Sequence, residues 1–424
     1  YVYLMWLDYM GTMRCRILHV RDLLHLIKTG KRVGIAQAII GVLQDDTITS
    51  ACSSVGQIFL HPEFTSLRAC HPKDRLPSAS VLCSWYDALG DPFDRCPRSM
   101  LGKSLNEMED IYSIIACLGF EVEVTFLRRT GDEDNPFEPI TKNHAWCAMS
   151  GDQWSNAMPL VAEIVSALEL SALPVLEFHA APGPGKYDFA LRPKPALQAI
   201  DALIQTRQII YQIAELHGIR ATLHPAPVPG AASGAHAHIS LNGEESSMQM
   251  LADNFFAGVI EHLESICAFS MPQAPSYDRV AEDRWTGGVW VAWGTQNREC
   301  PLRKVKSNHW EMRCADGTAN MYLAIGAVIA AGLEGIDLEK SLTHKDCQEK
   351  PHKMTAEERL EHGMTKMLPK SIEQSLQALE KDEQLQARMG PAMVKDYIVM
   401  KRQEQEKLKN MPKNEAHVWL VERY

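Results

Sequence analysis

The sequence lacks the features that mark several common classes of protein. Its 424 residues carry a formal net charge of -10, which argues against nucleic acid or an anionic membrane as the main partner. The 11 cysteines include no C-x-x-C pair, and an odd number of scattered thiols is typical of a reduced cytoplasmic protein rather than a disulfide framework. The longest apolar run, residues 321–336, contains glycines and a glutamate and is too short to span a bilayer, so it predicts a buried helix.

A phosphate-binding loop and a targeting segment are also missing. Residues 181–186 read A-P-G-P-G-K, but no glycine stands five positions before Gly185, and Tyr187 takes the place of the Ser or Thr that holds magnesium in such loops. The chain opens at Tyr1 without a methionine, a basic segment or a signal-type apolar core. We therefore expect a cytoplasmic protein, and a sequence that is a fragment of a longer one.

The length predicts two or three domains, since domains usually hold about 100–200 residues each. The first part of the chain predicts a small mixed α+β module with a short helix over residues 22–28, capped by Asp22 and ended by Gly30, and with strands at 3–10, 13–20, 55–60 and 80–86. We expect a domain boundary after residue 95, giving domains 1–95 and 96–424. A helix over residues 104–117 should follow the boundary.

The stretch 234–241, G-A-H-A-H-I-S-L, has the alternation of a β-strand. Its period places His236 and His238 on one face and the apolar residues behind them. Two imidazoles that converge from a rigid strand suit a divalent metal or a phosphate-bearing ligand. A strand that carries two half-buried, hydrogen-bonded histidines explains the same residues, so this stretch alone leaves both interpretations open.

Carboxylates follow the same alternation elsewhere. Glu121 and Glu123 share one face of a predicted strand over 119–127, where burial is costly unless a cation or an arginine compensates the charge. A solvated edge strand is the alternative. Residues 309–313 likewise place His309, Glu311 and Arg313 on one face.

Arginines are dense between residues 279 and 313, where tryptophans alternate with Arg279, Arg284, Arg298, Arg303 and Arg313. This density in an acidic chain suits the binding of phosphate or carboxylate, although surface ion pairs are the alternative. The segment 355–424 is rich in charge and predicts helices, which we expect to be peripheral.

Taken together, these motifs stand in the order and spacing of the glutamine synthetase family. The resemblance rests on E-V-E at 121–123, G-A-H-A-H-I-S at 234–240, N-R at 297–298 and E-M-R at 311–313, and it covers nearly the whole chain. Residues 290–299, W-V-A-W-G-T-Q-N-R-E, are more similar to the fungal FluG-type branch. The resemblance implies an α+β fold with an N-terminal β-grasp domain and a catalytic domain built on a curved antiparallel sheet flanked by helices.

The resemblance also implies an activity. Family members are ATP-dependent ligases that activate the side-chain carboxylate of glutamate, or a similar acid, as an acyl phosphate, which ammonia or another amine then attacks. ATP and Mg²⁺ or Mn²⁺ are the implied cofactors, because both steps develop negative charge that cations must stabilise. The implied partners are a small-molecule acid, an amine, and further copies of the chain in a ring whose active sites lie between subunits.

Implied roles follow residue by residue. The metal nearer the ATP phosphates would be held by Glu121, His236 and Glu311. The nucleotide would meet His238 and Ser240.

The two remaining roles fall to four arginines. The transferring phosphoryl group would be clamped by Arg298 and Arg303. The carboxylate substrate would be bound by Arg279 and Arg313.

The second metal site departs from the family pattern of three glutamates. The first corresponds to Glu123, but an alignment without a gap puts Ala181 and Asp188 at the other two positions. We therefore expect a second metal that binds weakly or not at all; a gap in the alignment would make Glu177 a candidate ligand instead. The loss leaves open a catalytically weakened or inactive relative with a regulatory or scaffolding role.

The nucleophile site departs as well. Counting from Arg279, Trp285 stands where the family has a flap glutamate that helps to receive ammonium, although Glu282 or Asp283 could restore a carboxylate after a small shift. Trp285 predicts a larger, partly apolar amine rather than ammonia.

A third interpretation takes His236-x-His238 as the metal motif of an amidohydrolase barrel. That motif normally lies on the first strand of the barrel. Here it falls past the middle of the chain, with no alternating βα units before it, which disfavours a barrel.

Overall fold

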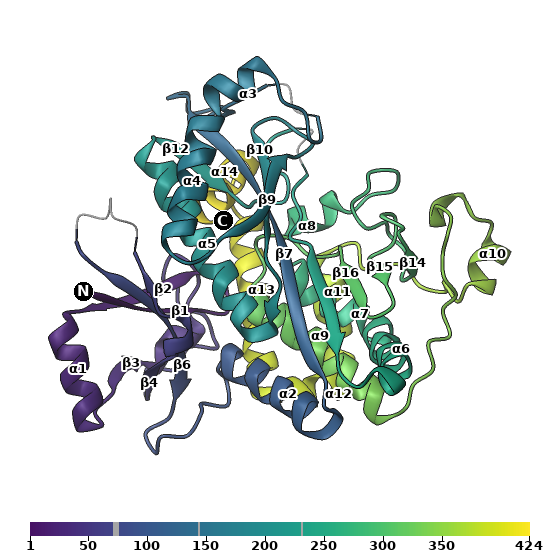
Figure 1. Ribbon diagram of the computed structural model, residues 1–424, viewed down its shortest axis with the longest axis horizontal. Helices are drawn as coiled ribbons and strands as arrows, with labels where there is room; N and C mark the ends of the chain where they lie inside the picture. The colour runs from purple at the N-terminus through teal and green to yellow at the C-terminus, as the bar shows by residue number, and fades with distance from the viewer. Residues whose placement is uncertain (71–75, 143–144, 230–231) are drawn as a thin grey trace.

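The chain folds around two β-sheets, and Figure 1 shows the smaller, N-terminal one in purple at the lower left and the larger one in the centre. This computed structural model describes residues 1–70, 76–142, 145–229 and 232–424. Helices pack against both sheets, as predicted for an α+β protein. The boundary expected after residue 95 stays a prediction.

The N-terminal sheet has the strand order β2-β1-β6-β4-β3, with β5 paired to β6. Its strands are β1 (Val2–Leu7), β2 (Met13–Leu18), β3 (Val33–Ala36), β4 (Gln57–Pro62), β5 (Arg68–Ala69) and β6 (Ala79–Tyr86). The strands predicted at 3–10 and 13–20 are confirmed as a hairpin, because β1 pairs antiparallel with β2 and Gly11 between them has a φ of 79°. The strand β1 also runs parallel to β6.

The helix α1 (Val20–Thr29) starts before the predicted position. His19, not Asp22, is its N-cap, because the His19 side chain accepts a hydrogen bond from the amide of Arg21. Gly30 ends the helix in the left-handed conformation, as predicted. Short 3-10 turns lie at η1 (Gln37–Gly41), η2 (Phe64–Ser66) and η3 (Pro351–Lys353).

The strand β7 (Ile115–Arg129) is the longest strand of the described chain and runs diagonally through the centre of Figure 1. It replaces the end of the helix predicted over 104–117: α2 (Pro97–Tyr112) stops at Ser113, which adopts a φ of 53° and returns its amide to the last turn. Ile115 therefore belongs to the strand, and its helical spacing was misleading.

The larger sheet has the order β14-β15-β16-β13-β7-β10-β9, with β8, β11 and β12 also paired to β7. These strands are β8 (Phe137–Pro139), β9 (Val175–Ala180), β10 (Lys186–Leu191), β11 (Lys194–Pro195), β12 (Ile219–Thr222), β13 (Ala237–Asn242), β14 (Trp293–Thr295), β15 (Leu302–Lys306) and β16 (His309–Met312). The pairings are antiparallel except for the parallel pair of β14 and β15.

The helices between β8 and residue 337 are α3 (Gly151–Asn156), α4 (Met158–Leu170), α5 (Ala196–Leu216), α6 (Glu245–Glu261), α7 (Leu263–Ser270), α8 (Ala274–Arg279) and α9 (Met321–Asp337). The apolar run of α9 is buried over Met321 to Ile336, which confirms the predicted buried helix. It crosses α6 closely because Gly258 has no side chain: a Cβ there would lie 2.2 Å from the carbonyl oxygen of Ala331.

The C-terminal helices are α10 (Ala356–Glu361), α11 (Ile372–Lys381), α12 (Glu383–Met389), α13 (Pro391–Lys409) and α14 (Lys413–Arg423). The expectation that this segment is peripheral is wrong. Lys401 and Glu404 form a buried ion pair on α13. Gln44 of the N-terminal module donates to Glu404 at 2.5 Å and to the Tyr424 hydroxyl at 2.6 Å. The C-terminal residues therefore contact the N-terminal module through polar groups that are buried or partly buried.

None of the helices in the described part of the chain combines the length and the apolarity needed to cross a bilayer.

A buried histidine makes the stability of this fold dependent on pH. His224 follows β12, is 1% exposed, and packs its ring 5.0 Å from that of His417 on α14. Burial and, to a smaller extent, the neighbouring His417 lower the pKa of His224 from 6.5 to about 3. At pH values between these two pKa values, His224 therefore binds a proton in the unfolded chain but not in the folded chain. Stability is complete above about pH 6.5 and is lost as the pH falls toward about 3.

On going from about pH 7 to about pH 5, we expect the wild type to lose about 2 kcal/mol more free energy of unfolding than His224→Asn. Asparagine offers an acceptor to the Ala226 amide, which His224 Nδ1 binds at 3.0 Å, but it does not titrate. Urea denaturation at both pH values measures the difference. His25→Asn, at an exposed position on α1, is the control and should behave as the wild type. Equal losses in the wild type and His224→Asn would contradict the prediction.

Candidate functional site

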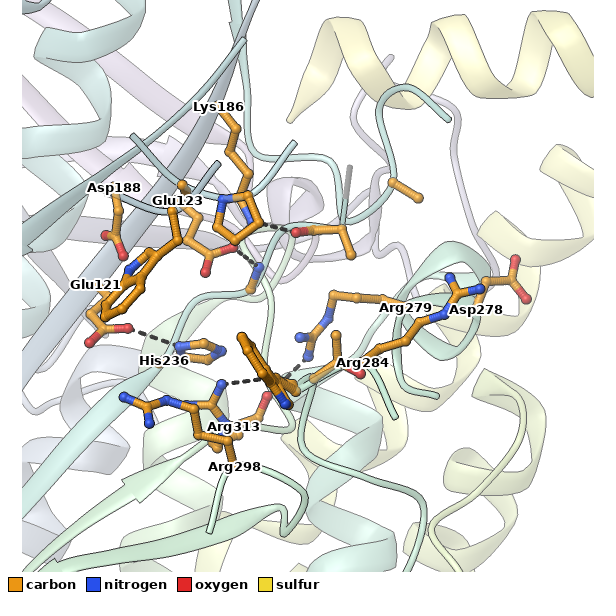
Figure 2. A pocket seen from close by; sticks show the side chains of 18 of the residues that line it. Glu121, Glu123, Lys186, Asp188, His236, Asp278, Arg279, Arg284, Arg298 and Arg313 are labelled. Atoms are coloured by element: carbon orange, nitrogen blue, oxygen red, sulfur yellow. Dashed lines mark hydrogen bonds and ion pairs between the residues drawn. The ribbon is translucent and has the colours of Figure 1, made fainter. Parts of the chain in front are cut away.

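A cavity of about 1930 Å³ lies against the larger sheet and is lined by residues of β7, β9, β10, β15 and β16, by the segment after α8, and by α14. In Figure 2, Glu121, Glu123 and Asp188 lie together at the left of this cavity, and Arg279 and Arg284 lie to the right. Acidic side chains and arginines thus face the same space. The site can therefore take a cation at one end and an anion at the other.

Strand register brings the acidic residues and the histidines together. His238 of β13 stands opposite Glu311 of β16 and opposite Gly119 of β7. One step further along, the amide of Glu121 donates to the carbonyl of His236 at 3.2 Å. Directly opposed residues of neighbouring strands project to the same face, so side chains from three strands meet at one place.

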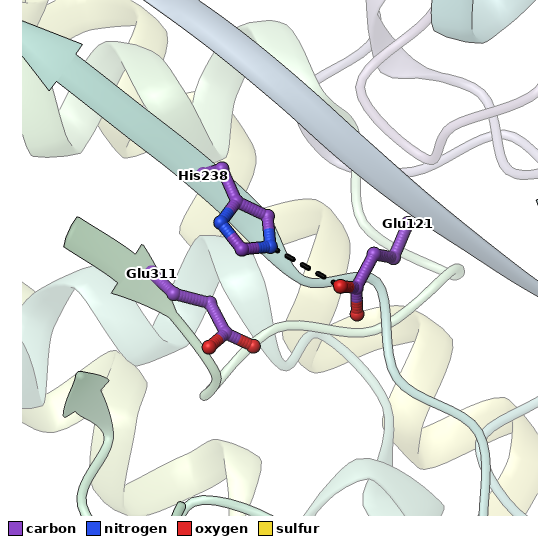
Figure 3. Close-up of side chains that lie close together, drawn as sticks. All are labelled: Glu121, His238 and Glu311. Carbon is purple, nitrogen blue, oxygen red and sulfur yellow. Dashed lines mark hydrogen bonds and ion pairs between the residues drawn. The ribbon is translucent and has the colours of Figure 1, made fainter. Parts of the chain in front are cut away.

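The resulting cluster contains Glu121, His238 and Glu311, whose ligand atoms lie within 4.8 Å of one another (Figure 3). His238 Nε2 is 3.2 Å from Glu121 Oε1. His236, the residue just before β13, places Nδ1 2.9 Å from Glu121 Oε2 and 3.4 Å from Glu311 Oε1. Both imidazoles therefore reach the same pair of carboxylates, as the strand alternation predicted for their direction.

The electrostatics keep these carboxylates ionised. Burial opposes the ionisation of Glu121, but the hydrogen bonds from His236 and His238 outweigh it and hold the pKa of Glu121 below its usual range. Burial likewise opposes the ionisation of Glu311, and the charges of His236 and Arg313 reverse that effect, so its pKa is also lowered. Two ionised carboxylates with imidazole nitrogens are a donor set that fits Mg²⁺ or Mn²⁺.

The histidine that completes this arrangement was not assigned a role from the sequence. His309 Nε2 lies 2.9 Å from His238 Nδ1, so one ring nitrogen of the pair donates to the other. This contact fixes the ring of His238 with Nε2 toward Glu121, as outer hydrogen bonds commonly orient metal-binding histidines. The spacing of His309 and Glu311 on one strand face was the signal available in the sequence.

Ser240 lies further along β13 from the acidic cluster than His238 does. It lies on β13 between Cys117 of β7 and His309 of β16. The residues that line the cavity, within the described chain, include His236 but neither His238 nor Ser240. His238 reaches the acidic cluster from behind the cavity wall, whereas Ser240 is one strand period further away.

The structure brings the four predicted arginines to the same cavity. Arg303 donates to Glu311 at 2.7 Å, and Arg313 forms a second ion pair with Glu311. The Arg279 guanidinium is buried and donates to the carbonyl oxygens of Arg313 and Ala315 at 3.0 Å and 3.1 Å.

These guanidinium groups do not use all of their hydrogen-bond donors. The Nε atoms of Arg279, Arg303 and Arg313 are buried and have no hydrogen-bond partner in the described structure. Arg298 is exposed to the cavity, where partial burial and the charges of Arg303 and Arg313 lower its pKa. Clustered cations with incomplete compensation attract phosphate or carboxylate groups.

Glu123 forms an ion pair with Lys186, a residue to which no role was assigned from the sequence. Lys186 of β10 places Nζ 2.5 Å from Glu123 Oε2, and the Gly234 amide donates to the same oxygen at 2.7 Å. Burial raises the pKa of Glu123, but Lys186 outweighs it and lowers the value to about 2. Asp188 stands opposite Glu123 in the sheet, and its Oδ1 atom is buried without a hydrogen-bond partner. The alternation of Lys186 and Asp188 along β10 was the signal in the sequence.

The segment after α8 presents Trp285 to the cavity. Trp285 is 63% exposed, its φ is 54°, and its amide donates to Glu299 Oε1 at 3.0 Å. Asp283 instead pairs with Lys350 and lies 3.4 Å from His352, and neither it nor Glu282 is among the described residues that line the cavity. The buried Glu299 therefore holds this flap with an aromatic side chain inward.

Known proteins resemble this chain in sequence and in fold. Residues 94–424 match the model of the glutamine synthetase catalytic domain. The chain is 39% identical to protein FluG of Emericella nidulans over 100% of its own length and 49% of FluG, so it spans about half the length of that relative. It is 29% identical to the glutamine synthetase of Methanocaldococcus jannaschii over 82% of this chain and 79% of that protein.

Solved structures share the fold. A glutamine synthase homolog superimposes with a TM-score of 0.81 at 24% identity and covers 100% of this chain and 98% of its own. GmaS in complex with ADP gives a TM-score of 0.80 at 21% identity, with 97% of this chain and 94% of that chain covered. The resemblance and the fold class predicted from the motifs are thereby confirmed. The chain belongs to the glutamine synthetase family.

Proposed function

We propose that the chain is an ATP-dependent carboxylate–amine ligase that uses a small acid and an amine larger than ammonia. The observation that carries the proposal is the convergence of Glu121, Glu311 and two histidines beside a cavity lined by arginines. This arrangement offers a cation site and an anion site within one space. Membership of the glutamine synthetase family supports the reaction type.

The chemistry explains why both sites are needed. A carboxylate is a poor acyl donor, because its leaving group would be oxide, and phosphorylation replaces that leaving group with phosphate. A bound divalent ion would supply charge stabilisation for the phosphoryl transfer. Glu121, Glu311 and one of the two histidines would hold this ion, and their donor set fits it.

The arginines would hold the anionic groups. Arg298 and Arg303 would bind the phosphoryl oxygens, because both side chains line the cavity and Arg298 is exposed to it. Arg279 and Arg313 would bind the substrate carboxylate through their planar, multiple donors. Ser240 is the predicted nucleotide-binding residue that the geometry supports least, since it lies outside the cavity lining.

The proposed amine specificity rests on the aromatic side chains. Trp285, Trp146 and Phe137 line the cavity, and Trp146 is fixed by a hydrogen bond of 3.1 Å from its Nε1 to His179. Ammonium needs a carboxylate to offset its charge and to accept the released proton. A flap that presents an indole favours an amine with an apolar portion, whose burial contributes about 25 cal/mol per Å².

The proposal also covers the oligomeric state of the protein and its location in the cell. Family membership supports a homo-oligomeric ring in the cytoplasm, with active sites completed between subunits. Exposed Leu24 and Ile27 on α1 offer an apolar surface that such contacts would cover.

Replacing Glu121 by Gln should weaken Mn²⁺ binding at least about tenfold, because Glu121 is the carboxylate that contacts both histidines. Calorimetric titration with Mn²⁺ and a non-hydrolysable ATP analogue provides the measurement. We expect His236→Ala to match the loss in Glu121→Gln. A comparable loss only in His238→Ala would assign the ligand role to that imidazole.

His217→Ala is the matched control for these histidine variants, because His217 pairs with Glu163 on another part of the surface. It should bind Mn²⁺ as the wild type does. Unchanged Mn²⁺ affinity in Glu121→Gln would contradict the proposed metal site.

Phosphate release in the presence of glutamate and ATP should be slow with ammonia and faster with at least one larger amine. Trp285→Glu should shift the preference toward ammonia, because it returns a carboxylate to the flap. Ratios of kcat/KM for a panel of amines measure this shift. Trp154→Glu, at an exposed position on α3, is the matched control and should keep the wild-type ratios.

Fast use of ammonia by the wild type would contradict the amine assignment. Absence of phosphate release with every acid and amine tested would instead favour the catalytically inactive alternative.

A further inference from the structure

Lys186 is a buried cation at the acidic end of the cavity. Its side chain is 3% exposed, and Nζ lies 2.5 Å from Glu123 Oε2. The same ammonium donates to the carbonyl of Ala232, and its charge acts on Asp188. Figure 2 shows Lys186 extending toward Glu123 beside Asp188. A lysine is rarely buried to this extent unless its charge is required by its surroundings.

The surroundings require a positive charge at this point. Glu123 faces Asp188 on the neighbouring strand, and Glu121 lies two residues away on the same face of β7. Like charges this close are costly to bury without compensation. The ammonium of Lys186 supplies one charge and two identified hydrogen bonds, to a carboxylate and to a backbone carbonyl.

The same place is a poor site for a divalent ion. Glu123 Oε2 already accepts from Lys186 and from the Gly234 amide. Ala181, which lines the cavity, offers a methyl group in place of a ligand, and the further carboxylates on this side are Asp188 and the exposed Glu177, whose charge acts on Asp188. Mg²⁺ and Mn²⁺ prefer about six oxygen or nitrogen donors, and a fixed ammonium beside them would repel the ion.

We propose that the ammonium of Lys186 takes the place of the second divalent ion of this family, so that each subunit binds a single divalent ion. This inference rests on the proposed function, since it assumes that the cluster of Glu121 and Glu311 binds the first ion. Because the ammonium is part of the chain, it cannot dissociate into solvent as a bound metal ion can. Its hydrogen bond to the carbonyl of Ala232 also links β10 to the segment that leads to His236. Its charge is therefore present whatever the concentration of free metal.

Titration of the purified chain with Mn²⁺ alone, followed by the electron paramagnetic resonance signal of free Mn²⁺, tests the proposal. We expect one ion per subunit in the wild type. The variant Ala181→Glu, Lys186→Gln, Asp188→Glu should bind two, because it removes the ammonium and restores carboxylates. Lys186→Gln alone should gain a weaker second ion, whereas Lys186→Arg should not, because it keeps the charge.

Controls separate this inference from the proposed function. Lys194→Gln, on β11 and away from the cavity lining, should keep one ion per subunit. Glu121→Gln should remove the first ion without affecting the second ion of the triple variant. Thermal melting followed by circular dichroism identifies any variant that fails to fold, and the pair Lys186→Gln and Lys186→Arg then decides the question.

Two results would overturn the inference alone: two tightly bound ions in the wild type, or a single ion in the folded triple variant. Absence of Mn²⁺ binding to the wild type would contradict the proposed function and this inference with it.

Discussion

The register of β7 against its two neighbours is the constraint on which the site depends. On one side β7 pairs with β13, which brings Glu121 to the histidines, and on the other it pairs with β10, which brings Glu123 to Asp188. The buried side chains of Phe120 and Val122, which alternate with Glu121 and Glu123 along β7, fix which face of the strand meets the core. A shift of one residue would exchange the two faces and place the carboxylates in the apolar core, so packing and chemistry select the same register.

Burial of these carboxylates determines the rest of the cavity. Each buried charge needs a partner, and the structure supplies histidines for Glu121, guanidinium groups for Glu311 and an ammonium for Glu123. The compensation of Glu311 draws Arg303 and Arg313 to the cavity wall, where their Nε atoms stay unpartnered. The arginines that stabilise Glu311 thus also belong to the group for which we propose anion binding.

The sequence predicted the faces of the strands better than the partners across them. Alternation located β7 and the histidine stretch, and the apolar run located α9, because burial on one face leaves a periodic trace. The contacts of His309 with His238 and of Lys186 with Glu123 join residues far apart in the chain, and periodicity carries no information on such pairs. The contacts between Gln44, Glu404 and Tyr424 were not predicted either, because polar residues in such a network have the same sequence pattern as a solvated surface.

Lys186 and Trp285 line the same cavity, and in the proposed reaction their effects on the nucleophile would have the same direction. Lys186 neutralises Glu123, which removes an acidic group that could attract an ammonium ion. Trp285 replaces a flap carboxylate with an indole, which offers an apolar wall and no proton acceptor. Under the proposed function, these two groups would supply no negative charge to the nucleophile, so they would contribute little to holding a small cation. In the proposed reaction, affinity for the nucleophile would then come mainly from apolar area, which ammonia lacks and a larger amine provides.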